Sequence, residues 1–274
     1  PKGMSSTASA TLATWFKIHG VNYSISSACS TSAHCIGNGY ELIQWGKQDM
    51  VFAGGHEDLH WSMSNLFDAM GAMSSKFNDR PAEASRAYDV DRDGFVIAGG
   101  AGVLVLEELE HAKARGAKIY AEIVGYGASS DGGHATRPNQ DMMAAAMRLA
   151  LRDAGVSAQD IGFVCAHGTA TDHGDIAESR ATAEVLGHKP FASYKGHMGH
   201  TLGACGALES WFAIEMMNRD RFDPTLNLKN PDPECGDVDY VMNQSRDIRT
   251  EYVMNNNFAF GGVNSSLVFR RWHF

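Results

Sequence analysis

The chain has 274 residues, of which 44% are hydrophobic and 20% are charged, and its formal net charge is −9. This is the composition of an ordinary globular protein, and without clusters of lysine and arginine it gives no support for a nucleic-acid or anionic-membrane partner. No apolar run approaches the roughly 18 residues of a membrane-spanning helix, and no signal-peptide pattern is visible.

Strand and helix patterns alternate along the chain. The expected strands lie at residues 21–26, 50–53, 102–106, 119–126, 161–166, 191–193, 252–256 and 265–269. The expected helices lie at residues 31–45, 107–115, 142–154, 176–186 and 203–217. This alternation indicates an α/β fold with buried sheet strands. No low-complexity linker interrupts it, which favours one compact unit.

The cysteines are odd in number and lack the CxxC spacing of metal and redox motifs. The five positions are Cys29, Cys35, Cys165, Cys205 and Cys235. We expect most of them to be reduced and buried, which favours a cytoplasmic location.

The run His56-Glu57-Asp58-Leu59-His60 matches the H-E-x-x-H pattern of zinc peptidases. On a helix this spacing would place two imidazoles one turn apart, where they bind zinc while the glutamate activates a water. The extended form of the motif fails, because Met63 stands where it requires glycine. A zinc peptidase built on His56, Glu57 and His60 is therefore a remote alternative.

Cys29 lies among small residues between the expected strand 21–26 and the expected helix 31–45. A thiol at a helix N-terminus feels the helix dipole and free N–H groups, so we expect a pKa below the usual value of about 8.5. The same N–H groups can stabilise an oxyanion. On this fragment alone, a small buried core cysteine is the simpler interpretation.

Two further segments carry histidines. His167 follows the expected strand 161–166, and ligands bind at the carboxyl ends of strands in open α/β sheets. A loop histidine bonded to the backbone explains it equally well. Lys195 and His200 precede the expected buried helix 203–217, and a buried lysine needs a carboxylate partner or a function.

The segment 257–264 reads NFAFGGVN, a glycine turn between two strands. Alone it indicates only a tight turn. The order of the four motifs along the chain is more informative than any one of them. With Cys29 first, then His167, then Lys195 and His200, and FAFGGVN last, the chain resembles the condensing enzymes of the thiolase-like superfamily. The resemblance is strongest to 3-oxoacyl-[acyl-carrier-protein] synthases of types I and II. It extends from about residue 12 to residue 271 through FKIHGVNYSISSACSTSAHCIG, FDAMGAMS, YDVDRDGFVIAGGAGVLVLEELEHA and YAEIVGYGASSDG.

The resemblance implies a decarboxylating Claisen condensation. A cysteine-bound acyl chain reacts with malonyl-[acyl-carrier protein] to give 3-oxoacyl-[acyl-carrier protein], in fatty-acid chain elongation. It implies Cys29 as the acyl acceptor, and His167 and His200 as neutral donors that stabilise the enolate. It also implies that Lys195 and Glu178 form a buried pair that orders the site.

The remaining site residues come from the same resemblance. The backbone N–H groups of Cys29 and Phe260 would form the oxyanion hole, and the Phe260 ring would gate the acyl pocket. Thr169 and Thr171 would bind the phosphopantetheine arm. The supporting residues of the turn would be Phe258, Gly261 and Gly262. No metal and no cofactor are expected, because the substrates arrive on the arm of the acyl-carrier protein.

Two positions depart from the family pattern. Ala259 stands where relatives usually have glycine, and its methyl group would restrict a positive φ and the movement of the gate. Asp172-His173 replaces the usual proline after the second threonine, which puts the contacts with the carrier arm in question.

The resemblance implies a thiolase-like, layered αβαβα architecture with mixed sheets, whose N-terminal half is incomplete in this chain. Residues 1–117 would be the C-terminal part of the first half, carrying the cysteine, and residues 118–274 the second half, carrying both histidines. The expected partners are acyl-carrier protein and a second copy in a homodimer, with a heterodimer as the other arrangement. The alternative function is a specialised polyketide or polyene ketosynthase, or its non-catalytic partner subunit. Retention of Cys29, His167, Lys195 and His200 argues against the partner subunit.

Overall fold

A computed structural model of the protein describes residues 3–273. The first part of the chain contains α1 (Thr7–Phe16), α2 (Thr31–Gln44), β1 (Met50–Glu57), α3 (Trp61–Ala69), β2 (Gly100–Glu107) and α4 (Leu109–Ala114). The middle contains β3 (Ala121–Ser130), α5 (Gln140–Ala154), β4 (Ile161–Cys165), α6 (Asp172–Leu186), β5 (Pro190–Ala192) and α7 (Lys195–Met198). The last part contains α8 (Cys205–Asn218), β6 (Arg221–Phe222), β7 (Asp239–Tyr240), β8 (Arg246–Asp247), β9 (Tyr252–Ala259) and β10 (Val263–Arg271).

The larger sheet is mixed, with strand order β3-β10-β9-β4-β5-β7. β10 is antiparallel to both β3 and β9, whereas β9, β4, β5 and β7 run parallel. A separate antiparallel pair joins β1 to β2, with Met50 opposite Glu107 and Glu57 opposite Gly100. The short strands β6 and β8 form a third pair.

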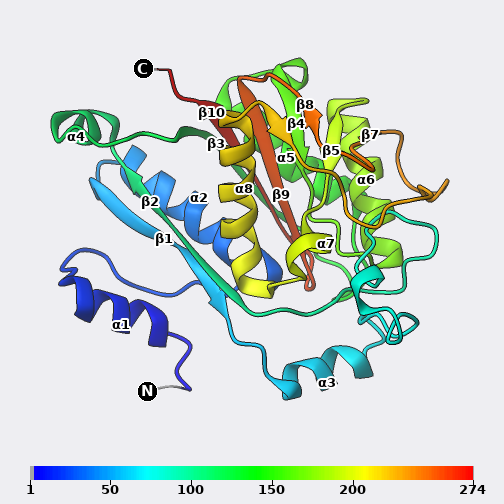
Figure 1. Ribbon diagram of the computed structural model, residues 1–274. Helices are drawn as coiled ribbons and strands as arrows, with labels where there is room; N and C mark the ends of the chain where they lie inside the picture. The colour runs from blue at the N-terminus through cyan, green and yellow to red at the C-terminus, as the bar shows by residue number, and fades with distance from the viewer. Residues whose placement is uncertain (1–2, 274) are drawn as a thin grey trace.

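The elements stack in layers. Helices α2 and α8 pack against each other, against β1 and β2 on one side, and against β10 of the large sheet on the other. Helix α5 covers the opposite face of that sheet over β3 and β10, with α6 beside it. Figure 1 shows α8 lying across β9, whereas α1 and α4 stand apart from the large sheet. The order is therefore helix, sheet, helix, sheet.

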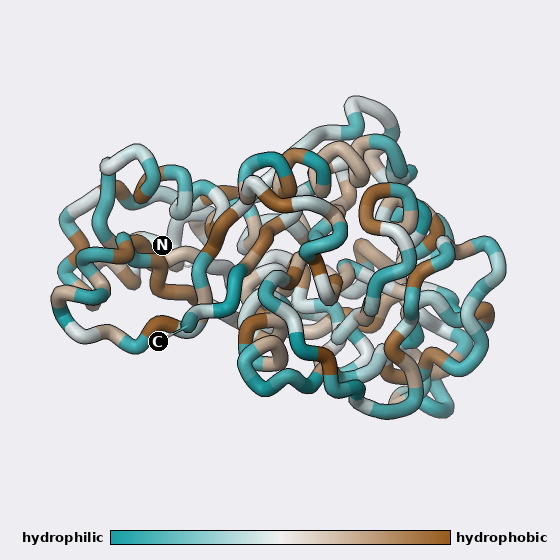
Figure 2. Tube along the Cα trace, turned by 90° about the horizontal axis from the view of Figure 1, so that it is seen from above, coloured by the Kyte–Doolittle hydropathy of each residue, from teal (hydrophilic) through white to brown (hydrophobic). Residues whose placement is uncertain are grey.

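The core follows these layers. All but one of the eight residues of β9 are buried, because α8 covers one face of the strand and the α5 layer covers the other. In Figure 2, hydrophobic positions run through the interior of the wider part of the molecule, and the loops at its rim are mostly hydrophilic. No helix within residues 3–273 combines the length and the apolar character that a membrane crossing requires.

Most expected elements are present, and three expectations are wrong. Residues 21–26 form no strand, because within residues 3–273 no strand lies beside them to pair with. The strand expected at 50–53 continues through Gly54 and Gly55 to Glu57. The strand expected at 102–106 is present within β2, but it is not buried, since Val103 and Val105 are 48% and 53% exposed.

Glycine is required where the two parts of the chain meet. A Cβ on Gly55 of β1 would lie 2.2 Å from the carbonyl oxygen of Gly203, just before α8. The absent side chain therefore lets the strand approach the segment that follows His200. This contact brings the first part of the chain against the histidine-bearing loops.

Candidate active site

Cys29 lies in a short 3₁₀ turn, Ala28–Ser30, which leads directly into α2. Ala28 has a φ of 49°, a left-handed conformation that is costly for a residue with a Cβ. The cysteine is 6% exposed, and the backbone N–H groups of Phe260 and of Cys29 itself are close enough to its sulfur to lower the pKa of the thiol. Two N–H groups therefore converge at the position of a reacting sulfur.

The pKa of Cys29 does not fall as expected. Burial raises the pKa of the thiol to about 11, and the positive charge of Lys195 and the two N–H groups oppose this only in part. The expectation of a lowered pKa was wrong because desolvation of the thiolate outweighs the helix terminus. In this state the sulfur carries its proton at neutral pH.

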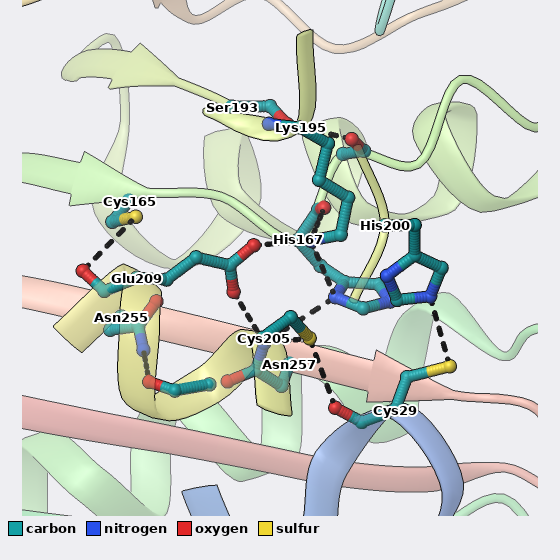
Figure 3. Close-up of polar contacts among 12 residues, drawn as sticks. Cys29, Cys165, His167, Ser193, Lys195, His200, Cys205, Glu209, Asn255 and Asn257 are labelled. Atoms are coloured by element: carbon teal, nitrogen blue, oxygen red, sulfur yellow. Dashed lines mark hydrogen bonds and ion pairs between the residues drawn. The ribbon is translucent and has the colours of Figure 1, made fainter. Parts of the chain in front are cut away.

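Two imidazoles face this thiol. His200 Nε2 lies 3.1 Å from Cys29 Sγ, and the rings of His167 and His200 meet edge to face with centroids 5.4 Å apart. His167 follows β4, His200 follows α7, and Figure 3 shows both rings directed toward Cys29. Burial lowers the pKa of both histidines well below the usual range, and Lys195 lowers it further. Both are therefore neutral.

The tautomer of His167 follows from its neighbours. Its Nδ1 lies 3.3 Å from Lys195 Nζ and 3.4 Å from Asn257 Nδ2. An ammonium and an amide nitrogen can only donate, so Nδ1 must accept and the proton must reside on Nε2. His167 therefore presents an N–H group from Nε2.

The carboxylate that pairs with Lys195 is Glu209 and not Glu178. Lys195 Nζ donates to Glu209 Oε1 and to the carbonyl oxygen of His167, and both charged side chains are fully buried, at 1% and 0% exposure. Burial by itself would lower the pKa of Lys195, but Glu209 outweighs it, so the pKa is raised and the lysine is cationic. The predicted pair with Glu178 was wrong because α8 brings Glu209 to the lysine from fourteen residues further along the chain.

Glu178 instead holds the loop after β4. Its carboxylate accepts from the backbone N–H groups of His167 and Gly168, at 2.7 and 2.8 Å, and from the Tyr88 hydroxyl at 2.8 Å. Burial raises the pKa of Glu178 to about 7, against the opposing effect of these donors. Asp175, one turn earlier on α6, binds the N–H groups of Tyr88 and Ala170. Two buried carboxylates thus anchor the loop that carries His167.

A cavity of about 290 Å³ opens onto the sulfur. Thr169 and Thr171 line it with their hydroxyl groups 2.9 Å apart. The Phe260 ring also lines it and lies 6.4 Å from the ring of Phe67 on α3. Other predicted site residues on its wall are Cys29, His167, Glu178, His200, Phe258 and Gly262, whereas Lys195 and Gly261 are not on the wall.

The two departures from the family pattern have structural outcomes. Ala259 is the last residue of β9 and has no positive φ, so its methyl group causes no backbone strain. The turn instead uses Gly261 and Gly262, whose φ values are 90° and 67°. Asp172 begins α6 and, together with His173, lines the cavity beside Thr171.

The H-E-x-x-H run is not on a helix. His56 and Glu57 end strand β1, and His60 is the N-cap of α3, where its ring accepts from the Ser62 N–H. Successive side chains of a strand point to opposite faces, so the run lacks the shared helical face that zinc binding needs. Glu57 accepts from the Gly203 N–H at 3.3 Å.

A cluster with metal-ligand spacing occurs at the site itself. Ligand atoms of Cys29, His167 and His200 lie within 4.8 Å of one another. A metal-bound histidine normally donates its second ring N–H to an acceptor. At His167 that second nitrogen faces the two donors Lys195 and Asn257, so the surroundings do not suit Nε2 as a metal ligand.

Sequence reasoning missed Glu209 and Asn257. Glu209 was visible as one of two carboxylates, with Glu215, inside the largely apolar segment 203–217, and Lys195 required a partner. Asn257 belongs to three consecutive asparagines in a buried strand, an arrangement that needs specific partners. Neither signal named the contact itself.

Known proteins resemble the chain over nearly its full length. Residues 1–112 match the family described as "Beta-ketoacyl synthase, N-terminal domain", and residues 120–229 match "Beta-ketoacyl synthase, C-terminal domain". The protein named 3-oxoacyl-[acyl-carrier-protein] synthase 1 of Escherichia coli (strain K12) is 51% identical over 272 residues, which are 98% of this chain and 66% of that protein. The chain thus spans about two thirds of the length of this relative.

Solved structures show the same fold. The crystal structure of a beta-ketoacyl synthase from Burkholderia phymatum STM815 matches with a TM-score of 0.96 and 50% identity, over 98% of this chain and 66% of that one. A type II PKS acyl-carrier protein in complex with its ketosynthase bound to the hexaketide matches with a TM-score of 0.94 and 35% identity, over 98% and 67%. The predicted thiolase-like layered fold with a mixed sheet is confirmed.

Proposed function

This chain belongs to the beta-ketoacyl synthase family, and we propose that it carries the catalytic residues for a decarboxylating condensation in fatty-acid chain elongation. The reaction joins a Cys29-bound acyl group to malonyl-[acyl-carrier protein]. The products are CO2, 3-oxoacyl-[acyl-carrier protein] and the free cysteine. One observation carries the proposal: a buried thiol faces two neutral imidazoles, one of which presents a fixed Nε2–H group.

The first step transfers the acyl group from its carrier to Cys29. The sulfur attacks the thioester carbon, and the carrier thiolate leaves. Because the pKa of Cys29 is raised, its proton must be removed as the new bond forms, and His200 Nε2 at 3.1 Å is placed to take it. The proton then leaves with the carrier thiol.

The second step breaks the bond between the malonyl α-carbon and its carboxylate. The electron pair stays on the α-carbon and is delocalised onto the thioester oxygen. Nε2–H of His167 donates a hydrogen bond to this oxygen. His200 donates a second one after its single ring proton, held on Nδ1 while Nε2 accepted the thiol proton, has moved to Nε2 by exchange with solvent. Neutral donors suit this task, and burial beside Lys195 keeps both rings neutral.

The third step forms the new carbon–carbon bond. The carbanion attacks the Cys29 thioester, and we assign the resulting oxyanion to the N–H groups of Cys29 and Phe260, both of which lower the pKa of the thiol. Collapse expels the Cys29 thiolate, which takes up from solvent the one proton that the condensation consumes. We assign Thr169 and Thr171 to the phosphopantetheine arm because their hydroxyl groups line the same cavity. The Phe260 ring, beside Phe67, would gate the acyl pocket, with Phe258, Gly261 and Gly262 supporting the turn.

Fatty-acid elongation is favoured over the polyketide alternative by degree of similarity. Identity is 51% to the protein named 3-oxoacyl-[acyl-carrier-protein] synthase 1 and 35% to the polyketide ketosynthase structure. We propose acyl-carrier protein as partner, since that ketosynthase is itself seen with one. We also propose a homodimer and a cytoplasmic location. We propose a division of the chain into residues 1–117 and 118–274, and the family matches at 1–112 and 120–229 support this division.

The test incubates the protein with acyl- and malonyl-carrier substrates and measures CO2 release and 3-oxoacyl product. Cys29→Ala should abolish condensation, while Cys35→Ala, a cysteine half-buried on α2, should retain it. Condensation by Cys29→Ala would disprove the assignment. Chelation should leave the activity unchanged, and stoichiometric zinc by elemental analysis together with loss of activity on chelation would favour the peptidase alternative.

A further inference from the structure

Asn257 occupies the centre of the polar network behind the two histidines. It lies on β9, is fully buried, and extends its side chain between α8 and the loop after β4 (Figure 3). Its amide nitrogen lies 2.7 Å from Glu209 Oε2, 3.4 Å from His167 Nδ1 and 3.6 Å from Cys205 Sγ. One amide thus contacts both the carboxylate that pairs with Lys195 and the imidazole that faces the cavity.

The orientation of this amide is determined by its surroundings. The Glu209 carboxylate only accepts hydrogen bonds, so the nitrogen and not the oxygen of Asn257 must face it. The oxygen points the other way, toward Gly206 of α8, where a Cβ would come within 2.7 Å of it. The missing side chain at Gly206 therefore leaves room for this orientation.

We propose that Asn257 is a positioning residue that holds Glu209 against Lys195 and keeps the proton of His167 on Nε2. Lys195 also faces Nδ1, but it donates at shorter range to Glu209 and to the His167 carbonyl. Asn257 supplies a second donor, so that no acceptor remains at Nδ1. The inference rests on the proposed function in one respect, since only the decarboxylation step uses the Nε2–H group.

A neighbouring residue provides the matched control. Asn256 is the same residue type on the same strand and is equally buried, but its side chain points to the opposite face of the sheet. There its oxygen accepts from Ser266 Oγ at 2.8 Å and its nitrogen lies 3.5 Å from Met147 Sδ. Neither of these two hydrogen bonds involves a residue of the site, so a change at this position tests for a purely structural effect.

The decisive variant is Asn257→Asp, which keeps the shape and replaces the donor by an acceptor. Whether the new carboxyl is ionised or shares a proton with Glu209, an oxygen then faces His167 Nδ1. Nitrogen-15 NMR of histidine-labelled protein distinguishes protonated from unprotonated ring nitrogens, with His167→Gln to assign the signal. We expect the proton on Nε2 in the unaltered protein and on Nδ1 in Asn257→Asp, with no change in Asn256→Asp.

The two half-reactions give the second readout. Asn257→Asp should slow malonyl decarboxylation by about 10-fold to 100-fold, because it reverses a donor that orients a catalytic imidazole. Transfer of the acyl group to Cys29 should change by less than about 3-fold, since that step relies on His200. Equal losses in both half-reactions, or an Nε2 proton in Asn257→Asp, would overturn the inference.

The unaltered protein keeps the test informative if the variant does not fold. A proton on His167 Nδ1 in that protein would overturn the inference directly. The NMR measurement requires no turnover. A protein with the proton on Nε2 that released no CO2 would therefore count against the proposed reaction and leave the positioning of His167 intact.

Discussion

The large six-stranded sheet and the β1–β2 pair differ in how far they bury their side chains. In β9 every residue after Tyr252 is buried, including three asparagines, because helices cover both faces of the large sheet. In β2 burial alternates, and Val103 and Val105 remain half exposed. Buried polar groups in β9 must therefore be satisfied by specific partners, whereas β2 tolerates change on its open face. The comparison teaches that the specific polar contacts are concentrated in the sheet whose two faces are both covered. The turn that carries Cys29 packs against this sheet at β9 and β10, and also against the segment before α8.

The largest difference in unfolding free energy should appear between a variant that breaks a buried ion pair and one that breaks an exposed ion pair. Glu209→Gln leaves the fully buried Lys195 without its counter-ion, and we expect a loss of about 3–5 kcal/mol in the free energy of unfolding. The control Glu110→Gln disrupts the exposed pair of Glu110 with Lys113 and should cost less than about 0.5 kcal/mol. Urea denaturation measures both. Similar costs for the two variants would contradict the comparison, and Lys195→Met added to Glu209→Gln should recover part of the loss.

Truncation of an apolar side chain should likewise cost more free energy of unfolding in the large sheet than on the open face of β2. Leu267→Ala in β10 creates a cavity in a fully buried position and should cost about 2–5 kcal/mol. Val105→Ala on the open face of β2 should cost roughly 0.5 kcal/mol. Urea denaturation measures both losses of unfolding free energy, which follow from the shift of the midpoint if the dependence on urea concentration is unchanged. A cost at Val105 equal to that at Leu267 would show that the open face is covered in solution.

The burial of Cys29 predicts how the rate of its alkylation depends on pH. Because its pKa is raised to about 11, the reactive thiolate is a minor form at neutral pH, and alkylation of Cys29 should accelerate about tenfold per pH unit from about pH 7 to about pH 10. Iodoacetamide labelling followed by peptide mass spectrometry measures it, with Cys29→Ala to subtract other thiols. A plateau above pH ~8.5 would mean that the thiol is less desolvated than its position in the fold implies.

The smallest effect on function is expected at the H-E-x-x-H run beside the open sheet. His60→Ala removes the N-cap contact of α3 and the exposed contacts of the ring with the Ser62 hydroxyl and the Trp61 ring, and it should cost about 0.5–1 kcal/mol. Condensation and metal content should stay unchanged, because His56 and Glu57 lie on strand β1. Elemental analysis and the CO2 assay check this, and a loss of bound zinc in His60→Ala would restore the metal interpretation.

The sequence by itself determined the fold class, most strands and helices, and the positions of Cys29, His167, Lys195 and His200. These follow from local patterns and from motif order, which need no knowledge of distant neighbours. It failed for residues 21–26, whose alternation is that of a strand, because no strand of the described residues 3–273 pairs with them. A strand requires a partner, and local pattern does not supply one.

Tertiary structure decided the interactions that connect distant segments. The partner of Lys195 is Glu209 rather than Glu178, because the packing of α8 against β9 and not the motif order places a carboxylate there. The pKa of Cys29 is raised rather than lowered, because burial depends on every segment around the sulfur. The tautomer of His167 depends on Asn257, ninety residues away. Desolvation and hydrogen-bond direction are properties of the assembled core, which explains why motifs located the site and only the fold defined its chemistry.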